Sequence, residues 1–188
     1  MTTIIAFYKF VTIEDLPVLR KHLQALTNRL SLKGTILIAT EGINSTISGS
    51  KENIQQFQEE LTSDPRFADI VFKESFYDDI SFRRMLVKIK KEIVTLKVGD
   101  QQVTQSTGAY LPPKEFKKWK EQGKEMILVD TRNDYEFKLG TFKGALNPKT
   151  NAFGEFPKWL EDNLSDKKDK TIVTFCTGGI RCEKATAY

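Results

Sequence analysis

The sequence has little of what several classes of protein require. Its 188 residues contain one histidine, two cysteines and no close cysteine pair, so an obvious zinc site or a histidine-based catalytic site is excluded. Two cysteines also argue against a disulfide framework and favour a reducing, cytoplasmic location. No apolar run approaches the ~20 residues that span a bilayer, and the N-terminus lacks the features of a signal peptide. We therefore expect no membrane partner.

Charge and composition are ordinary. Hydrophobic residues make up 39% of the chain, charged residues make up 29%, and the formal net charge is +4. These values are typical of a globular protein, and the length suits one medium domain or two small ones. Because the chain is only mildly basic, the distribution of its charges is more informative than their total.

The most informative segment is Thr171–Cys182, with the sequence TIVTFCTGGIRC. An apolar stretch ends at Cys176, and helix-favouring residues follow Arg181, which predicts a buried strand, a tight loop and the start of a helix. A thiol in this place lies among unpaired N–H groups at the positive end of a helix dipole, which favours the thiolate. We predict that Cys176 is a catalytic nucleophile and that Arg181 orients or neutralises an anionic adduct.

Four residues separate the cysteine from the arginine: Thr177, Gly178, Gly179 and Ile180. The glycines let the backbone approach the sulfur closely. This Cys-x4-Arg loop is one residue shorter than the Cys-x5-Arg cradle of protein tyrosine phosphatases, and a tighter ring suits a persulfide or another small group on sulfur. Two other interpretations stay open. Cys176 could be a buried structural cysteine, and Arg181 could serve only to cap the loop.

A second motif precedes the cysteine loop. Residues 130–147 follow the pattern D-x-R-x3-E-x3-G-x3-G-A-x-N, which resembles rhodanese domains. The sequence CTGGIRCEKA is more specific and resembles the rhodanese-containing family of tRNA uridine hydroxylases. Residues 7–10 (FYKF) and 39–50 (ATEGINSTISGS) resemble the small leading domain of that family. The resemblance therefore covers essentially the whole chain.

The resemblance implies an activity. Members of that family make 5-hydroxyuridine at the wobble position of tRNA, with molecular oxygen as co-substrate, so the implied partner is the anticodon arm of tRNA. Cys176 would be the family's rhodanese-type cysteine. No cofactor is evident from the sequence. One alternative is a rhodanese-like sulfurtransferase that carries a persulfide on Cys176, and a third possibility is a non-catalytic RNA-binding or regulatory module in which this cysteine is inert.

The order of elements predicts two domains. Residues 1–98 read as strand, helix, strand, strand, helix, strand, with a hairpin turn at Glu41–Asn44 and a late strand at Ile93–Leu96. This order indicates an α+β ferredoxin-like, acylphosphatase-like domain. The polar segment 99–109 is the predicted linker. Residues 110–188 predict an α/β rhodanese domain with a parallel sheet, which we expect to be incomplete at its C-terminus.

Further residues could support the cysteine loop. Cys182 lies about one helical turn beyond Cys176 and could resolve an oxidised or persulfidated cysteine as a disulfide, or it could simply pack inward. Asp130 and Arg132 end a strand whose carboxyl edge should lie near the loop. We expect this pair to brace neighbouring loops by ion pairing, with direct catalysis as the alternative. Glu136 is expected to cap or salt-bridge the following turn.

The strongest candidate for RNA binding is Phe82–Lys91, with the sequence FRRMLVKIKK. On a strand, Val87 and Ile89 would face the core, while lysines on the opposite face would form a cationic row suited to phosphates. The predicted RNA-binding residues are Arg83, Arg84, Lys88, Lys90 and Lys91, with Phe76, Tyr77 and Phe82 as possible stacking surfaces. The alternative is an edge strand that its lysines protect from aggregation.

Overall fold

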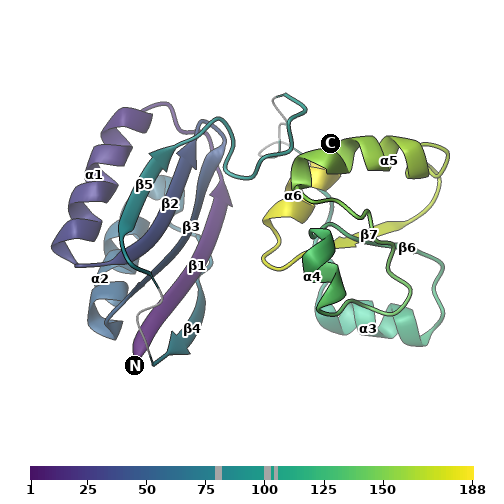
Figure 1. Cartoon of the computed structure of the whole chain (residues 1–188), viewed down its shortest axis with the longest axis horizontal. Helices are drawn as coiled ribbons and strands as arrows, with labels where there is room; N and C mark the ends of the chain where they lie inside the picture. Colours follow the sequence, from purple (N-terminus) through teal and green to yellow (C-terminus); the bar gives the residue numbers. More distant parts are fainter. Residues whose placement is uncertain (79–81, 100–102, 104–105) are drawn as a thin grey trace. The chain divides into compact units, whose positions relative to one another are not determined.

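The computed structural model describes residues 1–78, 82–99, 103 and 106–188. The chain divides into two compact units, Met1–Ile93 and Val94–Tyr188 (Figure 1). Part of the predicted linker, residues 100–102, 104 and 105, lies outside the described residues. Of the helices that the structure describes, none has the length and apolar character needed to cross a membrane.

The first unit contains one five-stranded sheet and two helices. Its elements are β1 (Thr2–Phe10), α1 (Leu16–Arg29), β2 (Lys33–Ala39), β3 (Gly42–Gly49), α2 (Lys51–Thr62), the 3₁₀ turn η1 (Pro65–Phe67), β4 (Lys73–Tyr77) and β5 (Met85–Ile89). The strand order is β4-β1-β3-β2-β5, and every pair is antiparallel except β2 with β5. The first four strands and the two helices form the split βαβ arrangement, which confirms the predicted ferredoxin-like fold.

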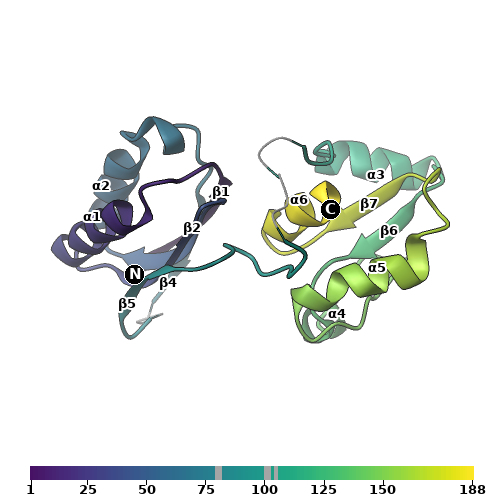
Figure 2. The same cartoon turned by 90° about the horizontal axis from the view of Figure 1, so that it is seen from above.

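Both helices cover the same face of this sheet (Figure 2). In α1 the buried Leu19, Leu23 and Leu26 recur at helical spacing and form one apolar stripe. The α2 helix begins where the Ser50 hydroxyl accepts a hydrogen bond from the Asn53 amide (3.2 Å). The core of the first unit therefore lies between these helices and one side of the sheet, where Ile36 and Ile47 are fully buried.

The hairpin between β2 and β3 is tighter than predicted. Strand β3 already begins at Gly42, so only Thr40 and Glu41 connect the strands, and the predicted turn at Glu41–Asn44 is wrong by two residues. Gly42 has φ of 148°, and a Cβ atom built there would lie 2.1 Å from the Lys9 carbonyl oxygen. The close approach of β1 thus requires glycine at this position.

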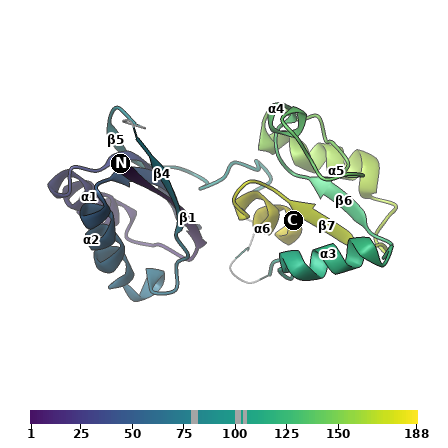
Figure 3. The same ribbon diagram turned by 90° about the horizontal axis from the view of Figure 1, so that it is seen from below.

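The second unit is built around a parallel pair of strands, β6 (Ile127–Asp130) and β7 (Ile172–Phe175). Its other elements are α3 (Pro113–Glu121), α4 (Asp134–Lys138), the 3₁₀ turn η2 (Phe153–Glu155), α5 (Phe156–Leu164) and α6 (Ile180–Ala187). Val129 also forms a parallel bridge to Leu146. Figure 3 shows α3 and α6 on one side of the strand pair and α5 on the other. This arrangement is the predicted α/β unit with a parallel sheet.

The segment that follows the first unit does not form the predicted strand at Ile93–Leu96. Ile93 is held to the first unit, because its amide donates to the Glu41 carboxylate (2.6 Å) and its carbonyl accepts from the Asn44 amide (2.9 Å). Leu96, by contrast, is fully buried in the core of the second unit, and Val98 packs against that core. The chain therefore passes between its two units at 93–94, before the predicted linker.

Candidate active site

The thiol of Cys176 lies in a ring of backbone amides. Strand β7 ends at Phe175, and the loop that follows turns into α6, so the Gly179 N–H donates to Cys176 Sγ at 3.0 Å. The pKa of Cys176 is lowered, first by a hydrogen bond from the Cys182 side chain and then by the amides of Cys182, Gly178 and Gly179. The site therefore favours a thiolate at Cys176.

Cys182 lies on the first turn of α6 and completes a dithiol with Cys176. Its sulfur is 3.6 Å from the Thr131 hydroxyl, whose own hydrogen bond goes to the Phe175 carbonyl (3.0 Å). A hydrogen bond from the Cys182 thiol to Cys176 raises the pKa of Cys182, and burial and the nearby charge of Cys176 raise it further. The pair thus carries one negative charge on Cys176 and keeps one proton on Cys182.

Arg181 contacts the loop through Glu136 and also directly, because its guanidinium donates to the Thr177 hydroxyl (3.3 Å). Its guanidinium donates to both carboxylate oxygens of Glu136, at 2.7 and 2.8 Å, and both side chains are about 15% exposed. Glu136 also accepts from the Thr177 hydroxyl (2.7 Å) and from the Asn133 amide (3.1 Å). The hydrogen bonds from Arg181 lower the pKa of Glu136 to about 2. Glu136 thus joins α4 to the cysteine loop.

Asp130 and Arg132 form a second ion pair beside the loop. Asp130 is fully buried, and its carboxylate accepts from Arg132 Nε (2.9 Å), from Arg132 Nη2 (2.7 Å) and from the Thr141 hydroxyl (2.9 Å). Arg132 also donates to the Gly140 carbonyl (2.7 Å). These bonds hold residues 140–141 against the end of β6, and they raise the pKa of Arg132.

A pocket of about 320 Å³ opens beside Cys176. It is lined by Arg132, Gly140, Thr141, Phe142, Phe175 and Cys176. The Phe142 ring is 49% exposed and meets the Phe175 ring edge to face, with centroids 4.8 Å apart. Sequence reasoning did not select Phe142, although it lies within the 130–147 motif, because nothing local indicates that this loop folds against β7. The pocket offers an aromatic surface, a cation and a thiolate to a small planar molecule.

The predicted RNA-binding residues lie in the first unit. Arg83 and Arg84 precede β5, Lys88 is within it, Lys90 and Lys91 follow it, and all five are exposed. Val87 is buried as predicted, but Ile89 is 43% exposed, so its assignment to the core is wrong. Ile89 ends β5, a strand at the edge of the sheet.

The loop after β7 and the ion pairs that hold it define the class of the second unit. Residues 112–188 match the family model for the rhodanese-like domain, and residues 2–93 match the model for the UPF0176 acylphosphatase like domain. Two proteins of Legionella pneumophila, from strains Paris and Corby and both named tRNA uridine(34) hydroxylase, are 47% and 46% identical over 98% of this chain and 72% of their own lengths. The chain belongs to the tRNA uridine(34) hydroxylase family.

Solved structures align with about half of the chain. The dark-state structure of the BLUF protein BlrB aligns with 51% of this chain and 77% of its own, with 17% identity and a TM-score of 0.41. The ground state of BlsA aligns with 48% of this chain at 18% identity and a TM-score of 0.41. These similarities carry no functional argument.

The thiol pKa predicts an effect of Cys182 on Cys176. Replacing Cys182 with alanine removes the largest cause that lowers the Cys176 pKa, so the Cys176 pKa should rise toward that of an ordinary thiol. The pH dependence of iodoacetamide alkylation, followed by peptide mass spectrometry, measures this shift. An unchanged alkylation midpoint in Cys182→Ala would mean that the two thiols do not interact.

The two loop glycines should differ in their tolerance of a side chain. Gly179 has φ of 99°, a region that L residues disfavour by about 1–2 kcal/mol. A Cβ at Gly178 would meet no atom within 4 Å. Gly179→Ala should therefore slow alkylation of Cys176 and lower the melting temperature, whereas Gly178→Ala, the matched control, should change both little. Equal effects of the two substitutions would contradict the loop geometry.

The Glu136–Arg181 pair should contribute to stability in a pH-dependent way. Because the folded-state pKa of Glu136 is lowered, its contribution is complete above its ordinary value of 4.5 and is lost as the pH falls toward 2. Glu136→Gln should lower the free energy of unfolding at pH 7 by about 1–3 kcal/mol and weaken its dependence on pH in that acid range. Glu125→Gln, at an exposed ion pair with Lys170, is the matched control and should have little effect. Urea denaturation of both variants, across this range of pH, measures the free energies of unfolding that are compared.

Proposed function

We propose that this protein is an enzyme that hydroxylates uridine 34 of tRNA to 5-hydroxyuridine. The observation that carries the proposal is its similarity, over 98% of its length, to proteins named tRNA uridine(34) hydroxylase. The cysteine loop supports it, because the Cys176 thiol has a lowered pKa and borders a pocket large enough for a small planar group. Molecular oxygen is the proposed co-substrate.

The pocket supports a specific position for the uracil ring. The exposed Phe142 ring gives the base a surface for stacking, and the Arg132 guanidinium gives donors for its carbonyl oxygens. Both groups line the pocket together with Cys176, so a base held there lies beside the thiolate. A base in a duplex or in a stacked loop could not reach this pocket, and the wobble nucleotide is therefore proposed to leave its stack before reaction.

The two units of the chain are proposed to have different roles, one in binding tRNA and the other in catalysis. The first unit, Met1–Ile93, would hold the anticodon arm, in part through the basic residues around β5, and the second unit, Val94–Tyr188, would carry the chemistry. Arg181 is proposed to fix the loop around Cys176, because its guanidinium is paired with Glu136. Cys182 is proposed as a resolving thiol, because it hydrogen-bonds to Cys176. The cytoplasm, where tRNA is modified, is the proposed location.

A sulfurtransferase is the second candidate function. It is favoured by the loop itself, because the amides that hydrogen-bond to Cys176 Sγ would also stabilise a terminal sulfur of a persulfide. In that reaction Cys176 would take a sulfane sulfur from a donor and pass it to a thiol or to tRNA.

Nucleoside mass spectrometry of tRNA distinguishes the two candidates. In cells that lack this protein, 5-hydroxyuridine and its derivatives at position 34 should disappear; wild-type protein should restore them and Cys176→Ser should not. The exposed Lys117→Ala variant, with the same expression level, is the control and should restore them fully. If thiolated nucleosides change instead, the protein is a sulfurtransferase. If no tRNA nucleoside changes, both candidates are wrong.

A further inference from the structure

The first unit has one sheet face that its helices do not cover. Figure 2 shows α1 and α2 together on the other face. Side chains alternate along each strand, so the residues between the buried ones point to the uncovered face. On β1 these residues include Tyr8 and Phe10. On β2 they include Lys33 and also Leu37, which lies between the buried Ile36 and Ile38.

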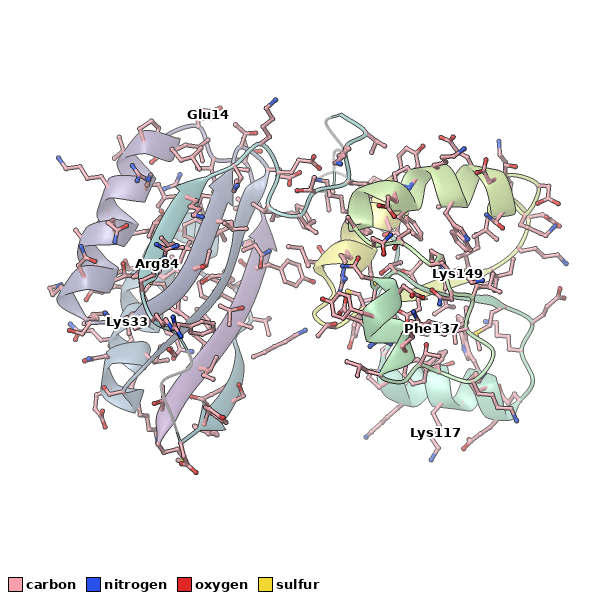
Figure 4. All side chains as sticks on the ribbon, viewed as in Figure 1. Glu14, Lys33, Arg84, Lys117, Phe137 and Lys149 are labelled. Atoms are coloured by element: carbon pink, nitrogen blue, oxygen red, sulfur yellow. The ribbon has the colours of Figure 1, made fainter. Side chains whose placement is uncertain are left out.

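The register of the strands aligns these side chains in rows across the sheet. One row runs from Tyr8 through Asn44 and Leu37 to Lys88, because each of these residues is paired with the next. At one end of the sheet Lys33 lies next to Arg84, whose carbonyl accepts from the Gly34 amide (3.0 Å); both residues are labelled in Figure 4. Within this row the Asn44 side chain is bound to the carbonyl of the buried Ile93 (2.9 Å), so the face has an aromatic side on β1 and a separate basic side on β2 and β5.

The charged side chains that the strands direct to this face are basic. The positions of the described strands that point to it include lysines 33, 73 and 88, flanked by Arg84 and Lys90, and no aspartate or glutamate. Glu74 of β4 is paired with the buried Ile5 and therefore points to the other face, while Glu52 and Glu60 lie on α2. The Glu41 carboxylate at the hairpin end is bound to the Ile93 amide (2.6 Å), and the cations along the strands of this face attract a polyanion.

The basic side continues into a hollow at the edge of the sheet. A pocket of about 360 Å³ lies along β5 and is lined by Arg20, Lys88 and Lys90 together with Val87 and Ile89. Arg20 Nε donates to the Val87 carbonyl (3.1 Å), which fixes its guanidinium beside the strand. Three cations around one hollow suit a phosphate group.

The aromatic side suits nucleobases. Tyr8 and Phe10 are half-buried, and their ring centroids are 6.2 Å apart. Their strand, β1, lies two strand spacings from β2 and three from β5, which is roughly 10 to 14 Å from the basic side. A flat sheet with aromatic rings on one strand and cations on another is a surface on which single-stranded bases stack while their phosphates meet lysine and arginine.

We infer that this uncovered sheet face binds single-stranded RNA, with bases over Tyr8 and phosphates along Lys33, Arg84 and Lys88. The inference rests on the proposed function, in which the single-stranded segment is the loop of the anticodon arm. It adds residues on β1 and β2 to the basic segment around β5 and assigns bases and phosphates to different strands of the sheet.

The test compares two double variants with the same change in charge. Lys33→Glu/Lys88→Glu alters the uncovered face, and Lys21→Glu/Lys51→Glu alters exposed lysines of α1 and α2. Binding of a fluorescent anticodon stem-loop RNA is measured by anisotropy at several salt concentrations, after circular dichroism shows that both variants fold. The sheet-face variant should bind at least about 10-fold more weakly and lower the salt slope by about 1.4, because two phosphate contacts are lost; the helix variant should bind within about 3-fold of wild type.

Aromatic substitution provides the second arm. Tyr8→Leu keeps an apolar side chain but removes the ring, and it should weaken binding several-fold with an unchanged salt slope. Equal binding of the RNA by the two charge variants would overturn the inference. The face would then be expected to be covered by another segment of this protein or by a second copy of it. Such a result would not affect the proposed function if 5-hydroxyuridine still depends on Cys176. If 5-hydroxyuridine does not depend on this protein but the sheet face still binds RNA, the proposed function is wrong and the inference about the face stands.

Discussion

The ion pair between Glu136 and Arg181 sets the geometry on which the cysteine loop depends. One carboxylate accepts from the Arg181 guanidinium, the Thr177 hydroxyl and the amide at the start of α4. These partners come from the two ends of the loop and from a helix about 40 residues earlier in the chain. Because the pair is largely buried and bidentate, it resists solvent screening better than a surface ion pair would. The loop can then present its amides to Cys176 in one arrangement.

That arrangement also decides where the charge lies within the dithiol. The amides and the Cys182 thiol all point their hydrogens at one sulfur, so Cys176 bears the negative charge and Cys182 holds the proton. Cys176 lies at the wall of a pocket that Arg132 and two phenylalanines also line. Asp130 keeps Arg132 in place with two hydrogen bonds. The two ion pairs thus have separate tasks, since one shapes the loop and the other shapes the pocket beside it.

Local pattern was sufficient to predict much of the fold. The leucines of α1 repeat at helical spacing, and the order of strands and helices in residues 1–98 fits only a few topologies, so the ferredoxin-like sheet followed from the sequence. The strand, cysteine, glycine and arginine of residues 171–182 likewise predicted a loop at a helix start. Contacts between residues far apart in the sequence could not be predicted in the same way. Glu136 was expected to support only its own turn, because its partner Arg181 lies 45 residues away, and no local signal marked Phe142 as a pocket wall.

The path of the chain at 93–94 has a practical consequence for dissecting this protein. Ile93 is bound by Glu41 and Asn44, whereas the next residue, Val94, accepts a hydrogen bond from the buried Lys184 of α6 through its carbonyl (3.0 Å). A cut within the polar segment 99–109 looks natural in the sequence, yet it would leave Leu96 on the wrong fragment and open a hole beside Val129 and Phe156. Separate expression of the two halves should therefore divide the chain after Ile93, which lets each fragment keep all of its own core.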